Sequence, residues 1–152
     1  MNNIKSINEY HHNEDEQLPI ISFDFDGVIH KSVIEGTTHP INYDQPTTWK
    51  PFEKMHSLLW ELSETHRIIV MTKRTEYMRK DTQYYIDAFG LPVEELYCTG
   101  GMDKWDLLEE LGAIRHYDDD EYMIDEYEGN PKESSVKLIL VSPITEEMIP
   151  QN

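Results

Sequence analysis

The chain has 152 residues, a length that predicts one domain with a sizeable core and no second independent domain. Its 30 acidic and 13 basic side chains give a formal net charge of −17, which predicts good solubility and a general repulsion of nucleic acid and anionic membranes. This charge argues against a broad polyanion-binding surface. It still allows one anionic group to be held locally by a metal ion and a few donors.

The N-terminal residues 1–17 are mostly polar, and we expect a flexible tail there that a few apolar side chains could dock weakly. They lack the apolar stretch of a signal peptide, and no window approaches the length of a membrane span. The single cysteine, Cys98, cannot form an intramolecular disulfide, and no Cys/His spacing indicates a zinc site. We therefore expect a cytoplasmic protein without a membrane partner. The sequence does not indicate its oligomeric state.

From residue 18 onward, apolar runs of strand length alternate with segments of helical period. In chain order we expect a strand at 19–25, a long loop at 28–50, a helix at 52–64, a strand at 67–71, a helix at 76–89, a strand at 95–98, a helix at 104–111, a strand at 113–117, a weaker acidic helix at 120–127 and a strand at 136–141. This alternation favours an α/β fold with a parallel sheet and helices on both faces. The domain is expected to span 18–142, followed by a C-terminal tail at 143–152.

The segment 28–50 has no clear period and contains Gly36, Pro40 and Pro46. Loops of this length are usually functional, and we expect it to act as a small flap near the carboxyl edge of the sheet. Within it, His30 has either a contact with substrate or, more often for such a residue, a structural role. Trp49 is expected to pack in the core, with stacking on a base or sugar as the alternative.

Carboxylates gather where two predicted strands end. Asp24 and Asp26 follow an apolar run, and their alternation along an extended chain aims them to the same side. Two such charges ~4 Å apart repel by roughly 4 kcal/mol at an intermediate dielectric. Because Asp118 and Asp119 are expected at the same edge, the cluster needs a cation, and carboxylate oxygens select Mg²⁺. The alternative without a functional role is that the acidic run from Asp118 forms only the first turn of a helix, where the helix dipole favours acidic residues.

One hydroxyl side chain and one positively charged side chain are expected beside these carboxylates. Thr72 ends the second predicted strand and Lys104 opens the helix after the third. Lys73 follows Thr72 and, with Arg74, adds positive charge that could grip a phosphate or another anionic group. Together with the carboxylates, these are the groups that a phosphoryl-transfer site requires.

The sequence here resembles the haloacid dehalogenase (HAD) superfamily of phosphohydrolases. Four motifs carry the resemblance in order: Asp24-Phe25-Asp26-Gly27-Val28, then Thr72 after the run Ile68-Ile69-Val70-Met71, then Lys104, then Asp118-Asp119. The first motif, an Asp-x-Asp-Gly sequence after a strand, is fairly specific. A lone Thr or Lys is informative only through the order and spacing of all four motifs. The resemblance implies a three-layer Rossmann-like sheet with a minimal cap or none, because no insert of domain size follows the first or second motif.

The resemblance also implies roles. Asp24 would attack phosphorus and form an aspartyl-phosphate, and Asp26 would protonate the leaving oxygen and later deprotonate water. Mg²⁺ would bind Asp24, the backbone carbonyl of Asp26 and Asp118, with Asp119 contacting its waters; Asp119 is the alternative direct ligand.

In the same scheme, Thr72 and Lys104 would donate to the phosphate oxygens, with Lys73 as a further contact. The layout is similar to small nucleotidases and polynucleotide 3′-phosphatase domains, so the expected substrate is a nucleotide or the phosphorylated end of a nucleic acid. The net charge of −17 weakens the case for a polynucleotide substrate. The alternatives are a receiver-like phospho-acceptor and a catalytically silent binding protein that keeps the fold.

Overall fold

The computed structural model of the chain describes residues 18–34 and 36–152. The predicted N-terminal tail at 1–17 lies outside the described residues. Within the described ranges the chain builds one sheet and has no large cap. None of the helices in this part is long and apolar enough to cross a membrane.

Six strands form the sheet, in the order β3-β2-β1-β4-β5-β6. Five are parallel, and β6 pairs antiparallel with β5 at one edge. The strands are β1 (Ile20–Phe23), β2 (Arg67–Thr72), β3 (Glu95–Cys98), β4 (Ala113–Asp118), β5 (Lys137–Val141) and β6 (Met148–Pro150). The chain moves outward from β1 through β3 and then returns to β4 on the other side of β1. The strand order therefore reverses between β1 and β4, which is where open α/β sheets bind ligands.

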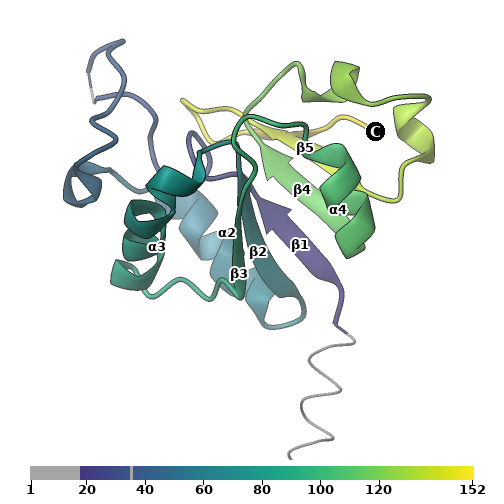
Figure 1. Ribbon diagram of the computed structural model, residues 1–152, viewed down its shortest axis with the longest axis horizontal. Coiled ribbons are helices and arrows are strands. Elements are labelled where there is room, and N and C mark those ends of the chain that lie inside the picture. The colour runs from purple at the N-terminus through teal and green to yellow at the C-terminus, as the bar shows by residue number, and fades with distance from the viewer. Residues whose placement is uncertain (1–17, 35) are drawn as a thin grey trace, which may run out of the picture.

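Helices cover both faces of the sheet (Figure 1). The helices α2 (Glu53–Ser63) and α3 (Arg79–Ala88) lie on one face, and α4 (Trp105–Leu111) lies on the other. Each face has its own apolar core, centred on Phe23 and Phe25 under α2 and α3 and on Trp105 and neighbours under α4. The predicted three-layer, Rossmann-like α/β fold is confirmed.

The helices begin and end where local chemistry predicts. Helix α2 buries Met55 and Leu59, which recur at helical spacing on the stripe that faces the sheet. Helix α4 follows Lys104 and ends at Gly112, whose φ of 75° is the left-handed conformation that closes a helix.

Two expectations are wrong in detail. The predicted helix at 120–127 is only a short 3-10 turn at Met123–Glu126, because the Asp118 and Asp120 side chains accept backbone N–H groups two residues further on and so compete with helical hydrogen bonds. The segment 143–152, expected as a tail, carries β6, so the sheet extends beyond residue 142.

The loop at 28–50 contains a 3-10 turn at Pro46–Thr48 and isolated bridges that tie His30 to Pro51 and Val33 to Pro40. It therefore has internal order, while its action as a flap stays a prediction.

Candidate active site

A cavity of about 290 Å³ lies at the carboxyl ends of β1, β2 and β4. It brings together every side chain that the sequence predicts for catalysis, phosphate binding and metal binding. Ser32 and Tyr43 from the long loop, together with Arg74 and Asp120, also line it, and the full set is Asp24, Asp26, Ser32, Tyr43, Thr72, Lys73, Arg74, Lys104, Asp118, Asp119 and Asp120. Residues that are up to 96 positions apart in the sequence are therefore delivered to one place by the parallel strands.

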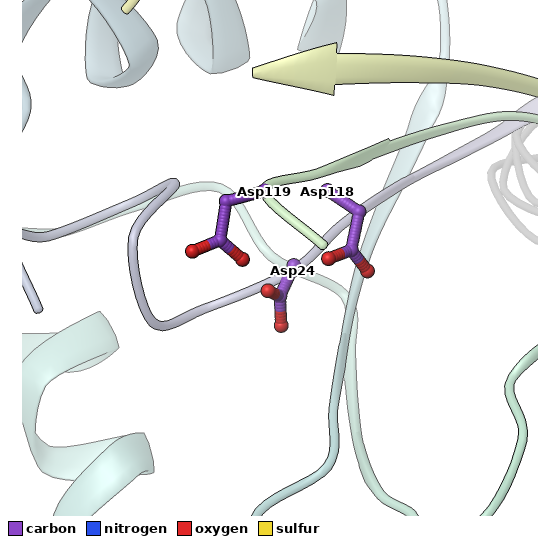
Figure 2. A group of neighbouring side chains, drawn as sticks. All are labelled: Asp24, Asp118 and Asp119. Atoms are coloured by element: carbon purple, nitrogen blue, oxygen red, sulfur yellow. The ribbon is translucent and has the colours of Figure 1, made fainter. Parts of the chain in front are cut away.

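Three carboxylates converge in this cavity (Figure 2). Asp24 follows β1, while Asp118 ends β4 and Asp119 comes next, and one oxygen from each lies within 4.8 Å of the others. Asp24 and Asp118 are buried, and Asp119 is partly buried. Hard carboxylate oxygens at this spacing, turned to a common space, suit a divalent cation of the Mg²⁺ type. The donor set therefore fits a metal ion.

The electrostatics of the three carboxylates show that their charges are incompletely balanced. Burial, followed by the charge of Asp118, raises the pKa of Asp24 well above its usual range. Burial also raises the pKa of Asp119 to about 6, although a hydrogen bond with Asp24 opposes this, and the charge of Asp118 adds to the rise. A cation placed among these oxygens would relieve both effects, which supports the metal-binding interpretation.

Lys104 supplies the positive charge within the cluster. Its Nζ lies 2.6 Å from Asp118 Oδ2 and 3.0 Å from Asp24 Oδ1, and the residue is 3% exposed. Burial disfavours its charge, but Asp24 and Asp118 outweigh burial and raise the pKa of Lys104. For Asp118, burial is outweighed by Lys104 and by a hydrogen bond from His116, which lower its pKa far below the usual range. One ammonium group thus faces three carboxylates.

Asp26 lines the cavity but is held by a different partner. Arg74 donates from Nε to Asp26 Oδ2 at 2.8 Å and from Nη2 to Asp26 Oδ1 at 2.7 Å, a two-bond pair that fixes the plane of the carboxylate. Burial alone would raise the pKa of Asp26, but hydrogen bonds from His30 and Arg74 lower it to about 2. The side chain of Asp26 thus lies outside the three-carboxylate cluster, as expected for a residue that would offer metal only its backbone.

Arg74 is itself fixed from several sides. Its guanidinium lies 4.3 Å from the ring centre of Trp49 and 4.7 Å from that of Phe25, and Nη1 donates to Thr82 Oγ1 at 2.9 Å. Trp49 is 2% exposed, so the packing interpretation is confirmed and stacking on a substrate base is excluded in this conformation.

His30 is buried between Trp49 and the Asp26 carboxylate. Its ring stacks on Trp49 with 5.0 Å between ring centres, Nδ1 donates to the backbone oxygen of Lys31 at 2.7 Å, and Nε2 lies 3.0 Å from Asp26 Oδ1. Since a carbonyl can only accept, Nδ1 carries a hydrogen, and Nε2 is the ring nitrogen that faces Asp26. His30 is therefore structural and a direct partner of a site carboxylate.

Thr72 and Lys73 occupy the end of β2. Thr72 is 1% exposed, and its hydroxyl oxygen accepts the backbone N–H of Arg74 at 3.2 Å, which leaves its hydrogen available for an anion. Lys73 is more exposed and lies 3.6 Å from Asp120 and 3.4 Å from Glu126. Thr72 is thus a well-placed donor, whereas Lys73 is engaged with acidic neighbours at the rim.

Comparison with solved structures adds to the fold assignment. A chain in the Pnkp1/Rnl/Hen1 RNA repair complex is 16% identical with a TM-score of 0.56, over 73% of this chain and 39% of that chain. A chain in another structure of the Pnkp1/Rnl/Hen1 complex is 15% identical with a TM-score of 0.60, over 84% and 47%. The present chain spans less than half the length of each of these two chains. No protein-family model matches the sequence, and no curated protein matches it.

Proposed function

We propose that this protein is a Mg²⁺-dependent phosphomonoester hydrolase of the HAD type that works through an aspartyl-phosphate on Asp24. The observation that carries the proposal is the convergence of Asp24, Asp118 and Asp119 with Lys104 and Thr72 around one cavity at the reversal of strand order. Negative carboxylates for a metal ion and neutral or positive donors for phosphate oxygens are both present there. The order of the four sequence motifs supports the same proposal.

The chain's own residues can perform the two steps of such a reaction. An oxygen of Asp24 attacks phosphorus, the bond to the leaving oxygen breaks, and that oxygen takes a proton from Asp26. Water then attacks the phosphorus of the aspartyl-phosphate and gives its proton to Asp26, which frees phosphate and restores Asp24. Asp26 needs a proton in the first step, which its lowered pKa of about 2 disfavours while Arg74 donates to both of its oxygens.

The phosphate oxygens would be held by Thr72 and Lys104, where negative charge shifts during transfer. Asp24, Asp118 or Asp119 and the backbone of Asp26 would hold Mg²⁺, which when bound supplies charge neutralisation and orients the phosphate.

The substrate that we propose is a nucleotide or a phosphorylated nucleic-acid end. The open site, without a large cap, admits a bulky leaving group. Ser32 lines both the cavity and a larger, mostly apolar groove of about 740 Å³, which includes Val33, Ile34 and Ile144 and offers space beside the phosphate. The fold shared with a chain of an RNA repair complex favours the nucleic-acid branch.

The test is release of phosphate by the full chain with Mg²⁺, first from p-nitrophenyl phosphate and then across mononucleotides, 3′- and 5′-phosphorylated oligonucleotides, sugar phosphates and phosphopeptides. Asp24→Asn should abolish release. Asp26→Asn should lose turnover but keep metal affinity, because its side chain is not among the clustered carboxylates. Wild-type protein that releases no phosphate from any substrate would identify a silent binding protein instead, and stable labelling of Asp24 by a phosphoryl donor without turnover would identify a phospho-acceptor.

A further inference from the structure

A buried histidine lies directly behind the carboxylate cluster. His116 is on β4, two residues before Asp118, and is 0% exposed. Its Nε2 lies 2.7 Å from Asp118 Oδ2, and its Nδ1 lies 2.8 Å from the hydroxyl of Ser22. Ser22 and His116 are register partners across β1 and β4, so both strands fix the ring. A side chain at the centre of a sheet is normally apolar, and this one instead forms two hydrogen bonds.

The direction of these hydrogen bonds follows from the chemistry of the partners. A carboxylate oxygen only accepts, so His116 Nε2 carries the hydrogen that is donated to Asp118. In the neutral ring Nδ1 then accepts, and the hydroxyl of Ser22 is the donor. Ser22 therefore selects the tautomer that can donate to Asp118. This is the arrangement by which an outer residue orients a carboxylate that binds metal.

The two oxygens of Asp118 are thereby made unequal. Oδ2 accepts from His116 Nε2 and from Lys104 Nζ, at 2.7 Å and 2.6 Å, so its acceptor positions are filled by two strong donors. Among the described residues, Oδ1 accepts only the backbone N–H of Asp120, at 3.0 Å. Since each carboxylate oxygen has two lone pairs, Oδ1 is the one that retains room for a cation. The orientation of Asp118 thus decides which oxygen the metal site receives.

Lys104 alone is a poor means of fixing that orientation. Its ammonium group is shared with Asp24 Oδ1 at 3.0 Å, and Asp24 is the residue whose charge changes in the proposed reaction. A flexible lysine stem can follow that change. His116, in contrast, is fixed by its strand and by Ser22 and has no contact with Asp24 among its hydrogen bonds in the described part of the chain.

We propose that His116, oriented by Ser22, is a positioning residue for a divalent cation: it holds Asp118 with Oδ1 directed to the metal throughout the reaction cycle. The inference rests on the metal-binding part of the proposed function and names residues that no motif of the HAD resemblance includes. It predicts a loss of metal affinity that is separate from any loss of fold.

The experiment measures Mn²⁺ binding to the full chain by calorimetry, without substrate. His116→Leu keeps the volume and removes the donor, and it should weaken Mn²⁺ binding by about tenfold. His116→Gln places an amide N–H near the position of Nε2 and should stay within about threefold of wild type. Thermal unfolding of each metal-free variant in EDTA reports whether the fold is intact. Wild-type affinity in a folded His116→Leu protein overturns the inference.

If His116→Leu does not fold, Ser22→Ala provides an independent test of the same hydrogen-bond chain. It frees the imidazole to adopt the other tautomer and should weaken Mn²⁺ binding by about threefold. Ser134→Ala is the matched control, because Ser134 is also buried and hydrogen-bonded, to Glu109, but neither residue lines the cavity that holds Asp24, Asp118 and Asp119. It should leave the affinity unchanged. Equal affinities for wild type, Ser22→Ala and Ser134→Ala would contradict the proposed role.

The inference and the proposed function can fail separately. If the wild type binds Mn²⁺ and the His116 variants behave as expected but no phosphomonoester is hydrolysed, the positioning role stands and the phosphatase does not. If the wild type hydrolyses phosphomonoesters with Mg²⁺ while His116→Leu retains full Mn²⁺ affinity, the phosphatase stands and the positioning role does not.

Discussion

At the scale of single residues, the least expected feature is the two-bond pair between Arg74 and Asp26. The sequence indicates that Lys73 and Arg74 add positive charge that could grip an anionic group, and it names Lys73 as the phosphate contact. In the structure Arg74 is 6% exposed and holds Asp26, whereas Lys73 lies at the rim with acidic neighbours. Arg74 therefore fixes the proposed acid and base of the reaction.

Arg74→Lys tests this role, because lysine keeps the charge but cannot form the planar two-bond contact. We expect kcat for p-nitrophenyl phosphate to fall by about 10- to 100-fold with little change in Mn²⁺ affinity, since Asp26 would lose its orientation while the three clustered carboxylates stay in place. Arg79→Lys is the control, because Arg79 pairs with exposed Glu76. Unchanged kcat in Arg74→Lys would show that the two-bond pair between Arg74 and Asp26 is not needed for turnover.

The pKa of Asp119 leads to a prediction on pH and metal. Because burial raises its pKa in the folded protein to about 6, above the ordinary value of 3.8, the folded metal-free state favours the protonated form. Its contribution to stability is present below about pH 4 and is lost as pH rises through about 6. The raised pKa of Asp24 acts in the same direction.

Thermal unfolding should therefore show a larger stabilisation by Mg²⁺ at pH 7.5 than at pH 5, by about 3 °C or more, since protons compete with metal for these oxygens at the lower pH. Asp119→Asn removes the titrating group and should flatten this dependence. A stabilisation by Mg²⁺ that is equal at both pH values would contradict the predicted linkage.

The sequence predicts which residues line the site because the parallel strands deliver their ends to one edge. Side-chain pairing is a different problem. Asp26 and Arg74 are 48 positions apart, and any of the 13 basic residues could have been the partner of a given carboxylate. His116 shows the same limit: its place before the fourth motif is evident from the sequence, but its hydrogen bond to Asp118 depends on how β1 and β4 lie in register.

At the scale of elements, the turn after β1 sets the distance between the first and fourth motifs. Gly27 has a φ of 78°, and a Cβ atom built there would overlap the carboxylate of Asp119. The turn is also fixed by a hydrogen bond from Gly27 N–H to His30 O at 2.9 Å. A side chain at this position would therefore push directly on a member of the carboxylate cluster.

Gly27→Ala should weaken Mn²⁺ binding by about tenfold or more and abolish phosphatase activity. Gly112→Ala is a matched control, because Gly112 also has a positive φ, 75°, but a Cβ there has nothing within 4 Å. It should cost only about 1 kcal/mol of conformational strain and leave metal affinity intact. Gly27→Ala with normal Mn²⁺ affinity would show that Asp119 can move aside without consequence for the site.

The sequence predicts helices and strands well where a regular hydrophobic period coincides with burial of the apolar side chains. It predicts them poorly where side chains compete for the backbone hydrogen bonds. The helix expected at 120–127 has acidic residues that satisfy backbone N–H groups themselves, and this competition reduces it to Met123–Glu126. The strand β6 has only three residues, too few for a recognisable alternation, and it exists because β5 offers it an open edge.

At the scale of the whole molecule, the fold follows from the alternation of strand and helix patterns. The net charge of −17, however, disfavours the binding of a polynucleotide substrate. A protein that binds nucleic acid through many Lys and Arg contacts loses affinity as salt rises. Here the net negative charge should repel a polyanion as it approaches, while in the proposed site Thr72, Lys104 and a metal ion would act only on the terminal phosphate. The salt dependence should therefore have the opposite sign.

With Mg²⁺ held at saturation, kcat/KM for a long 3′-phosphorylated single strand should rise about threefold or more as ionic strength increases from about 0.01 to 0.15 M, where the screening length falls from about 30 to 8 Å. A mononucleotide carries few charges, so its kcat/KM should change less than about twofold over the same range and serves as the control. The difference isolates the repulsion between the protein's net charge and the strand beyond the reacting phosphate. A steep fall with salt for the long strand would mean instead that local basic side chains such as Lys73 outweigh the overall charge, and that the polynucleotide is bound along its backbone.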